Sequence, residues 1–173
     1  SGKTKLAARL TKELGGEIIS ADSRQVYRGM DMGTGKDLSD YLVDGIAVPH
    51  HLIDIVEPDY EFSVFDYQRR FFQYFSEIAA RNVIAVLVGG TGLYIDAVLK
   101  SYRMPLVPED HDLRAELEDK ETDALIKRLI ALNPALHNTT DIKDRRRLIR
   151  AIEIAERSKE HGGEDNSSFP PLN

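Results

Sequence analysis

The sequence of 173 residues contains no cysteine. The protein can therefore form neither disulfide bonds nor thiolate metal sites, and this composition is compatible with the reducing cytoplasm, where we expect the protein to be found. The sequence also lacks any apolar run that approaches the roughly 18 residues of a transmembrane helix, so we expect no membrane partner.

An excess of positive charge is lacking as well. The formal net charge is −6, which argues against a protein coated in basic surface but is compatible with a local basic patch. The length, together with an apolar fraction of 42%, is typical of a globular chain with one main domain and a small addition.

The first four residues, Ser1-Gly2-Lys3-Thr4, match the second half of the phosphate-binding motif G-x-x-x-x-G-K-[ST]. The residues that follow predict an amphipathic helix over 3–14, with Leu6, Leu10 and Leu14 along one stripe. Backbone N–H groups at a helix N-terminus hold phosphate oxygens, Lys3 adds a full positive charge, and a Thr4 hydroxyl suits Mg²⁺. A diphosphate or triphosphate compound is the favoured ligand; the alternative is a helix that Ser1 merely caps.

Three nearly continuous apolar runs predict strands at residues 17–20, 51–55 and 83–88. Such runs are typical of strands buried on both faces of a parallel sheet. Ser63 and Asp66 have the spacing of a capping box and predict a helix, and another helix is predicted at 93–99. The sequence therefore predicts an α/β fold, with a P-loop-type parallel sheet flanked by helices. The stripe of the first of these helices that we expect in the core contains Phe65, Phe72, Phe75 and Ala79.

The strand signal ends after Pro105, and residues 112–157 predict charged helices. We expect them to begin near Asp112, near Asp123 and within 138–141. The phosphate motif is incomplete and the tail has no structural terminator, so we expect the natural chain to be longer. The sequence predicts an α/β core at residues 1–104, a helical insertion at 105–140, a basic helix at 141–157 that returns to the core, and a flexible tail at 158–173.

Ligands of open parallel sheets bind at the carboxyl ends of the strands. Asp22 directly follows the first predicted strand, where a carboxylate can bind Mg²⁺ or act as a general base. Gly89 and Gly90 follow the third strand and allow the backbone to approach a ligand, and Thr91 adds a hydroxyl. The alternatives are an aspartate that only stabilises a turn and a glycine turn that only joins a strand to a helix.

A basic cluster lies in the last predicted helix. One face of this helix is charged and the opposite face is apolar, which we expect to pack on the core. The charged face is typical of a solvated surface, and the alternative is contact with the phosphates of RNA. The cluster contains Lys143, Arg145, Arg146, Arg147 and Arg150; the charged face contains Arg146, Arg150, Glu153 and Arg157; the apolar face contains Leu148, Ile152 and Ala155.

Six segments, taken together, resemble the tRNA dimethylallyltransferases, also called tRNA isopentenyltransferases. They occur in the order found in that family and cover nearly all of residues 1–157. The second and fourth are much more specific than the phosphate motif alone. The segments are S-G-K-T-K-L-A (1–7), E-I-I-S-A-D-S-R-Q-V-Y-R-G-M-D-M-G-T-G-K (17–36), H-H-L-I-D-I-V (50–56), V-G-G-T-G-L-Y (88–94), L-V-P-E-D-H-D-L-R-A-E-L (106–117) and R-R-L-I-R-A-I-E-I (146–154).

The resemblance implies transfer of a dimethylallyl group from dimethylallyl diphosphate to N6 of an adenosine beside the anticodon in tRNA. It implies that Asp22 is the general base and that the Thr91 hydroxyl lies near the diphosphate bridge. It implies that Ser1, Gly2, Lys3 and Thr4 form the diphosphate and Mg²⁺ site, with Thr4 as the metal ligand. We expect a monomer. The residues implied to contact tRNA are Asp22, Ser23, Arg24, Gln25, Arg114, Arg146, Arg147, Leu148, Ile149 and Arg150.

Three other functions stay open at this point. The first is an adenylate isopentenyltransferase that modifies free AMP, ADP or ATP, and the helices at 112–157 favour RNA over it. The second is a P-loop kinase of a small molecule, in which the block at 22–36 is not expected. The third is a non-catalytic RNA-binding protein built on the fold of an enzyme.

Overall fold

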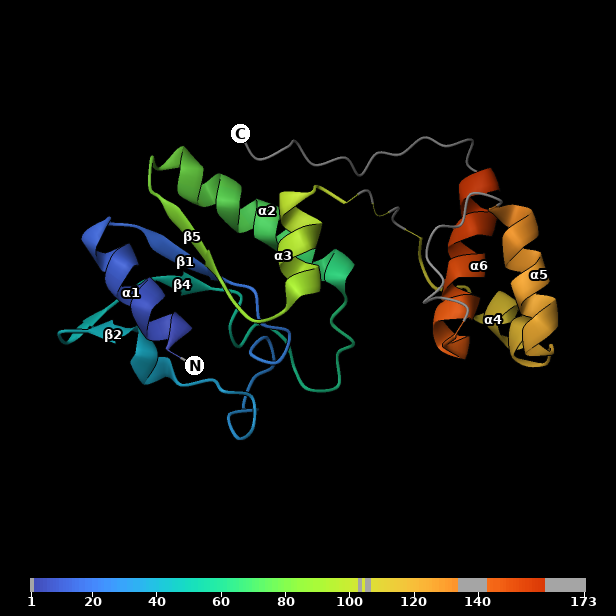
Figure 1. Ribbon diagram of the computed structural model, residues 1–173, viewed down its shortest axis with the longest axis horizontal. Coiled ribbons are helices and arrows are strands. Elements are labelled where there is room, and N and C mark those ends of the chain that lie inside the picture. The colour runs from blue at the N-terminus through green and yellow to red at the C-terminus, as the bar shows by residue number, and fades with distance from the viewer. Residues whose placement is uncertain (1, 103, 105–106, 134–142, 161–173) are drawn as a thin grey trace. The chain divides into compact units, whose positions relative to one another are not determined.

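The computed structural model describes residues 2–102, 104, 107–133 and 143–160 (Figure 1). The chain divides between Tyr102 and Arg103 into two compact units. None of the helices in the described ranges is long and apolar enough to cross a membrane.

The first unit is built on a three-stranded parallel sheet in the order β4-β1-β5. β1 (Glu17–Ser20) lies between β4 (His50–His51) and β5 (Ala85–Val88), and its residue Ile19 pairs with His51 on one side and Leu87 on the other. The strand predicted at 17–20 is confirmed, and the one predicted at 83–88 begins two residues later. Because the strands are parallel, their carboxyl ends meet at one edge of the sheet.

Both faces of the sheet are covered, as two neighbouring residues of β1 demonstrate. Ile19 packs in a cluster with α2 (Val64–Ala80) and α3 (Gly92–Leu99), whereas Ile18 packs in another with Ala8 of α1 (Lys3–Glu13). Neither isoleucine exposes more than 1% of its surface. This confirms the interpretation of the continuous apolar run and the predicted α/β fold with helices on a parallel sheet.

The strand predicted at 51–55 is largely wrong, because β4 ends at His51. Leu52 and Asp54 have positive φ angles of 65° and 52°, which extended backbone does not allow. The turn at Leu52 places its side chain, which is fully buried, in the cluster with α2 and α3. An apolar run that enters the core from a turn therefore looks like a strand in the sequence.

The apolar stripe expected on α1 is not the buried side of this helix in the described structure. Leu6, Leu10 and Leu14 are 70%, 51% and 46% exposed, whereas Ala7, Ala8 and Thr11 are buried. The small side chains bring the helix axis close to the sheet, and the larger leucines then point away from it.

The capping box of α2 is confirmed, because the Ser63 hydroxyl and the Asp66 carboxylate each accept the other residue's backbone N–H. The stripe expected in the core is only partly right. Phe72 is buried, but Phe65 and Phe75 are half-buried and Ala79 is exposed. The buried side of this helix is formed by Tyr67, Gln68, Phe71, Phe72 and Ile78.

A 3-10 helix, η1 (Leu38–Tyr41), and an antiparallel pair, β2 (Leu42–Val43) and β3 (Ile46–Ala47), were not predicted. The signal that could have found the pair is Asp44-Gly45, whose two positive φ angles fit a two-residue hairpin turn. These short elements matter because η1 carries Asp40 and Tyr41 to the site described below.

The second unit contains α4 (His111–Glu118), α5 (Thr122–Leu132) and α6 (Arg145–Glu160). α4 begins earlier than predicted, because Asp110 and not Asp112 caps it by accepting the N–H of Leu113 at 3.0 Å. The apolar residues of these helices form a separate core of Leu117, Leu125, Leu129, Leu148, Ile149 and Ile152.

The basic helix predicted to end at residue 157 continues to Glu160, so the first part of the predicted tail is helical. Residues 161–173 and the predicted caps at 138–141 lie outside the described residues. The return of this helix to the α/β core concerns the placement of the two units and stays a prediction.

An ion cluster around the buried Glu17 ties β1 to its neighbours at the amino end of the sheet. The guanidinium of Arg81 donates to both carboxylate oxygens of Glu17, and His51 Nε2 lies 2.7 Å from one of them. The hydrogen bonds from Arg81 lower the pKa of Glu17 to about 2, against the opposing effect of burial and with further help from His51. The carboxylate is thus much better stabilised in the folded chain than in the unfolded one.

Replacing Glu17 with glutamine should lower stability at neutral pH and remove an acid-sensitive contribution. Because the pKa of Glu17 falls from 4.5 to about 2 on folding, this contribution is present above pH 4.5 and is lost as the pH falls through 2. Its size is on the order of 3 kcal/mol. Urea unfolding of both proteins between pH 2 and 7 measures it, and parallel pH profiles would contradict the assignment.

Candidate active site

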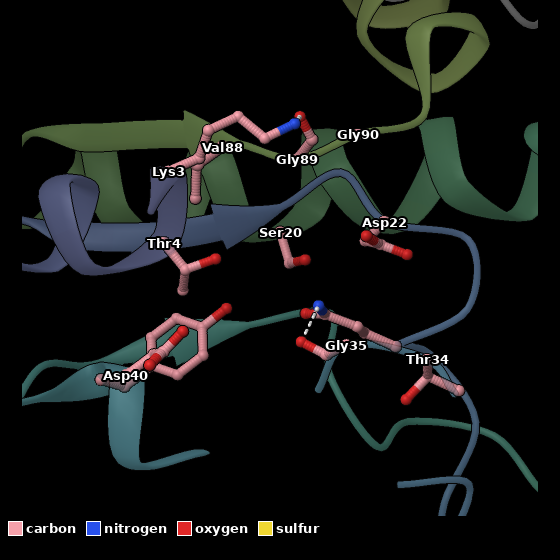
Figure 2. Close-up of a pocket in the computed structure, with 12 residues that line it drawn as sticks. Lys3, Thr4, Ser20, Asp22, Thr34, Gly35, Asp40, Val88, Gly89 and Gly90 are labelled. Atoms are coloured by element: carbon pink, nitrogen blue, oxygen red, sulfur yellow. Dashed lines mark hydrogen bonds between the residues drawn. The ribbon is translucent and has the colours of Figure 1, made fainter. Parts of the chain in front are cut away.

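Three segments meet at the carboxyl edge of the sheet and enclose a cavity of about 180 Å³ (Figure 2). They are the start of α1, the turn after β1 and the turn after β5. The loop at 34–35 and the end of η1 complete the wall. Most of the lining side chains are polar, and the lining residues are Lys3, Thr4, Ser20, Asp22, Gln25, Thr34, Gly35, Asp40, Tyr41, Val88, Gly89 and Gly90.

A cation and a carboxylate face the cavity from the two sides of Gly90. A Cβ atom added to Gly90 would lie 3.7 Å from Lys3 Nζ and 3.8 Å from Asp22 Oδ2. The two charged atoms are therefore less than about 8 Å apart. Lys3 reaches across to the turn after β5, where its Nζ donates to the carbonyl of Gly89 at 3.3 Å. The sequence predicted that these two groups share one site, and the structure brings them together.

The turns after β1 and β5 are in direct backbone contact. The N–H of Ala21 donates to the carbonyl of Val88 at 2.7 Å, and the carbonyl of Ala21 accepts the N–H of Thr91 at 3.0 Å. A Cβ atom on Gly89 would come within 2.1 Å of that carbonyl oxygen. Only a glycine permits this approach, so the glycine turn does more than join a strand to a helix.

The Thr91 side chain fixes the turn that carries Asp22. Its hydroxyl accepts the backbone N–H of Ser23 at 2.9 Å and donates to the Ser23 hydroxyl at 3.2 Å. Asp22 Oδ1 in turn accepts the N–H of Arg24 at 3.0 Å, which leaves Oδ2 on the side of the cavity. The expected place of the Thr91 hydroxyl beside a diphosphate stays a prediction, because in this structure the hydroxyl is engaged with Ser23.

The other predicted residues near the amino end have different surroundings. Gly2 is exposed and precedes the first turn of α1, where its carbonyl accepts the N–H of Leu6 at 3.1 Å. Gln25 is buried, and its Nε2 donates to the carbonyl of Gly35 at 3.4 Å. Arg24 is exposed, and Ser1 lies outside the described residues.

Sequence reasoning missed several residues of the cavity wall. Tyr41 and Asp40 come from η1, which carries no periodic signal, and Thr34 and Gly35 come from a loop without one. Burial, together with the charges of Asp40 and Asp22, raises the pKa of Tyr41 to about 12. Its hydroxyl therefore stays protonated at neutral pH. Asp40 adds a second carboxylate, whose Oδ1 lies 3.4 Å from Lys5 Nζ.

In the helical unit, two arginines predicted to contact tRNA bind the buried carboxylate of Glu153. Arg114 Nη2 donates to Glu153 Oε2 at 3.0 Å, and Arg150 donates to the same oxygen. Glu153 exposes none of its surface and also accepts the N–H of Asp110 at 2.6 Å. The interpretation of the charged face as solvated is thus wrong at Glu153, and Arg114 and Arg150 neutralise it.

The remaining residues of this predicted RNA surface divide into two groups. Leu148 and Ile149 are buried in the core of the helical unit, so their side chains support the helix. Their neighbour Arg145, which belongs to the basic cluster but not to the residues implied to contact tRNA, donates to the carbonyls of Leu117, Glu118 and Lys120 at the end of α4. Arg146 and Arg147 are exposed, and among the described residues none forms an ion pair with either of them.

The sequence model of a family described as IPP transferase matches residues 25–169. The chain belongs to the IPP transferase family. This family assignment agrees with the resemblance carried by the six sequence segments.

Curated relatives within this family are similar over nearly the whole chain. The tRNA dimethylallyltransferase 1 of Syntrophus aciditrophicus is 56% identical over 99% of this chain and 56% of its own length. The tRNA dimethylallyltransferase 2 of Syntrophotalea carbinolica is 58% identical over 94% of this chain and 53% of its own length. The chain thus spans about half the length of the curated relatives it matches.

Solved structures agree with the fold of this family. The tRNA isopentenylpyrophosphate transferase of Bacillus halodurans is 42% identical with a TM-score of 0.56, over 90% of this chain and 52% of that one. A eukaryotic dimethylallyltransferase acting on tRNA has a TM-score of 0.74 at 22% identity, over 98% of this chain and 43% of that one. The second likeness shows the fold alone. The P-loop-type α/β architecture is confirmed.

The two glycines of the turn after β5 should respond differently to alanine. Gly89→Ala places a methyl group against the backbone of Ala21 and should cost more than about 3 kcal/mol of stability. Gly90→Ala makes only ordinary contacts but fills space between Lys3 and Asp22. It should fold normally and bind inorganic pyrophosphate about tenfold or more weakly.

Thermal unfolding and calorimetric titration with pyrophosphate in the presence of Mg²⁺ distinguish the two variants. Unchanged pyrophosphate affinity in Gly90→Ala would show that the anion binds elsewhere. A fully stable Gly89→Ala protein would contradict the close backbone contact.

Proposed function

We propose that the protein transfers a dimethylallyl group from dimethylallyl diphosphate to N6 of an adenosine adjacent to the anticodon in tRNA. The observation that carries the proposal is the facing pair of Lys3 and Asp22 across Gly90. A cation at a helix N-terminus suits a diphosphate, and a carboxylate a few ångströms away suits removal of a proton. The names of the curated relatives support the same reaction.

The reaction needs both charged groups: Lys3 stabilises the diphosphate that leaves, and Asp22 accepts the proton that N6 loses. As the bond between C1 of the allyl group and the bridging oxygen breaks, its electron pair leaves with the diphosphate. Lys3 and the N–H groups at the start of α1 stabilise the negative charge that develops there. The N6 lone pair forms the new bond to C1, and the N6 proton passes to the Asp22 carboxylate. An aromatic amine is a weak nucleophile, so this proton acceptor contributes about 10²–10⁴-fold to the rate.

The oxygen atoms around the cavity fit Mg²⁺, which we propose as the metal of this site. Thr4 supplies a hydroxyl and Asp40 supplies a carboxylate on the cavity wall. Among the described residues no three His, Cys, Asp or Glu side chains form a cluster that could hold a metal ion. That suits Mg²⁺, which keeps several waters and binds substrate phosphates rather than a complete protein cage. When bound, the ion would neutralise charge on the diphosphate.

The RNA partner is proposed to approach through exposed cations. Arg146 and Arg147 at the start of α6 are exposed and have no ion-pair partner among the described residues, which suits contact with phosphates. The adenosine must leave its stack to enter the cavity, which costs little in a single-stranded loop. We propose that the protein acts on tRNA as a monomer.

Replacing Asp22 with asparagine should lower the turnover number about 10²–10⁴-fold, since the amide keeps the shape of the side chain but accepts no proton from N6. The affinity for tRNA should change far less. Single-turnover transfer of labelled dimethylallyl groups and filter binding of tRNA measure the two effects. Equal losses in turnover and affinity would count against a base role, and transfer to AMP in place of tRNA would redirect the proposal to free nucleotides.

Arg146→Ala and Arg114→Ala form a matched pair for the RNA contact. Arg146→Ala should weaken tRNA binding and reduce the slope of log K against log salt by about one, because one phosphate contact is lost. Arg114→Ala should instead destabilise the helical unit by about 1.5–3 kcal/mol, because Glu153 stays buried with one partner fewer. An unchanged salt slope in Arg146→Ala would remove this residue from the proposed interface.

A further inference from the structure

Lys36 is a buried lysine close to the candidate active site. Its side chain is 1% exposed, and its ammonium group is surrounded by oxygen atoms. Nζ lies 2.7 Å from Asp31 Oδ1, donates to the carbonyl of Tyr27 at 3.1 Å and also donates to Asp54 Oδ1. The ammonium thus has three protein partners, and with so little exposure it has no surface left to contact a substrate.

One partner of Lys36 is attached to the turn that carries Asp22. The backbone N–H of Asp54 donates to the carbonyl of Gln25 at 3.0 Å, and the next N–H, of Ile55, donates to the carbonyl of Val26 at 2.8 Å. Asp54 has a positive φ of 52°, which an aspartate adopts at a cost. The ion pair with Lys36 helps hold Asp54 in this conformation, in which its backbone bonds the turn.

The other contacts of Lys36 hold the loop on the opposite wall of the cavity. The backbone N–H of Lys36 donates to the Thr34 hydroxyl at 3.3 Å, and that hydroxyl donates to the carbonyl of Met30 at 2.8 Å. The carbonyl oxygen of Gly35 accepts a hydrogen bond from Gln25 Nε2 at 3.4 Å, which is the dashed line in Figure 2. Thr34 and Gly35 both line the cavity, so the loop and the turn are linked twice, through Lys36 and through Gln25.

We propose that Lys36 is a positioning residue for the reaction, which holds the Asp22 turn and the loop at 34–35 at a fixed separation through Asp54. The inference rests on the proposed function of the cavity. The phosphate-binding side, Lys3 and Thr4 on α1, makes none of these contacts. Loss of Lys36 should therefore disturb the carboxylate and the opposite wall while the diphosphate cradle stays in place.

Because Lys36 contacts only one side of the cavity, a positioning role can be distinguished from a purely stabilising role. If Lys36 only stabilised the fold, its removal would lower the melting temperature, because Asp31 and Asp54 would lose their cation. The variant that still folds would then have normal chemistry. If it positions Asp22, the folded variant itself is slow. A displacement of about 1 Å at a reacting group costs about 10²-fold in rate.

The test compares Lys36→Met with Lys12→Met in the whole protein. Lys12 is likewise paired to an aspartate, with Nζ 2.6 Å from Asp44 Oδ2, but this contact joins α1 to the turn between β2 and β3 and not to the segments that Lys36 links. In Lys36→Met, kcat should fall about 10–100-fold while KM for dimethylallyl diphosphate stays within about threefold. Lys12→Met should leave both constants unchanged.

Hydrogen exchange supplies a readout that does not depend on turnover. Amides of residues 22–25 and 34–36 should exchange faster in Lys36→Met, while those of α1 should not change. Normal kcat in folded Lys36→Met, or exchange unchanged at both segments, would overturn the inference. If the unaltered protein transfers no dimethylallyl group, the proposed function fails, and the exchange result still decides whether Lys36 couples the two segments.

A second variant covers the case in which Lys36→Met does not fold. Asp31 is the more exposed of the two carboxylate partners, with 69% of its side chain accessible, so Asp31→Asn should keep the fold. It weakens one of the contacts that hold the ammonium. A fall in kcat of a few fold with unchanged KM is expected, and kcat equal to that of the unaltered protein would count against the inference.

Discussion

The contact between the backbone of Gly89 and that of Ala21 is the constraint on which the site depends. It joins the turns after two neighbouring strands so closely that a single added methyl group would overlap a carbonyl oxygen. Because the turns are joined, the carboxylate that follows β1 and the glycine that follows β5 face the same space. The start of α1 adds the cation to this space. The cavity therefore has opposite charges on two sides because β1 and β5 pair in parallel and because Gly89 lets their turns touch.

Charge inside this acidic chain is arranged in small neutralising groups. Glu17 has Arg81 and His51, Glu153 has Arg114 and Arg150, and Lys36 has Asp31 and Asp54. A buried charge is tolerated when it is paired and hydrogen-bonded. Each of these groups also joins elements that are distant in sequence. The arrangement also explains why a count of arginines in the helical unit overestimates the cations available to RNA. Several of them are already bound to the protein itself.

The sequence predicted features that depend on local or strongly periodic signals. β1, the capping box at Ser63 and the glycine turn were found because apolar runs, hydrogen-bonding side chains and glycines act within a few residues. The site residues Lys3 and Asp22 were placed together because ligands bind at the ends of parallel strands. The buried side of α1 and the short β4 could not be predicted, since each depends on which side chain fits the sheet. Two partners of Glu153, Arg114 and the backbone of Asp110, lie about 40 residues away and follow from no local pattern.

The carboxylate of Glu153 has an evolutionary consequence. Two guanidinium groups and one backbone amide bind it, so replacing either arginine leaves the buried carboxylate with one partner fewer, and replacing the carboxylate removes a partner of both arginines. An apolar replacement becomes tolerable only when all three positions change together. Lineages of this family should accordingly keep the trio of Arg114, Arg150 and Glu153 intact or exchange it as a block, and intermediates with two of the three should be rare.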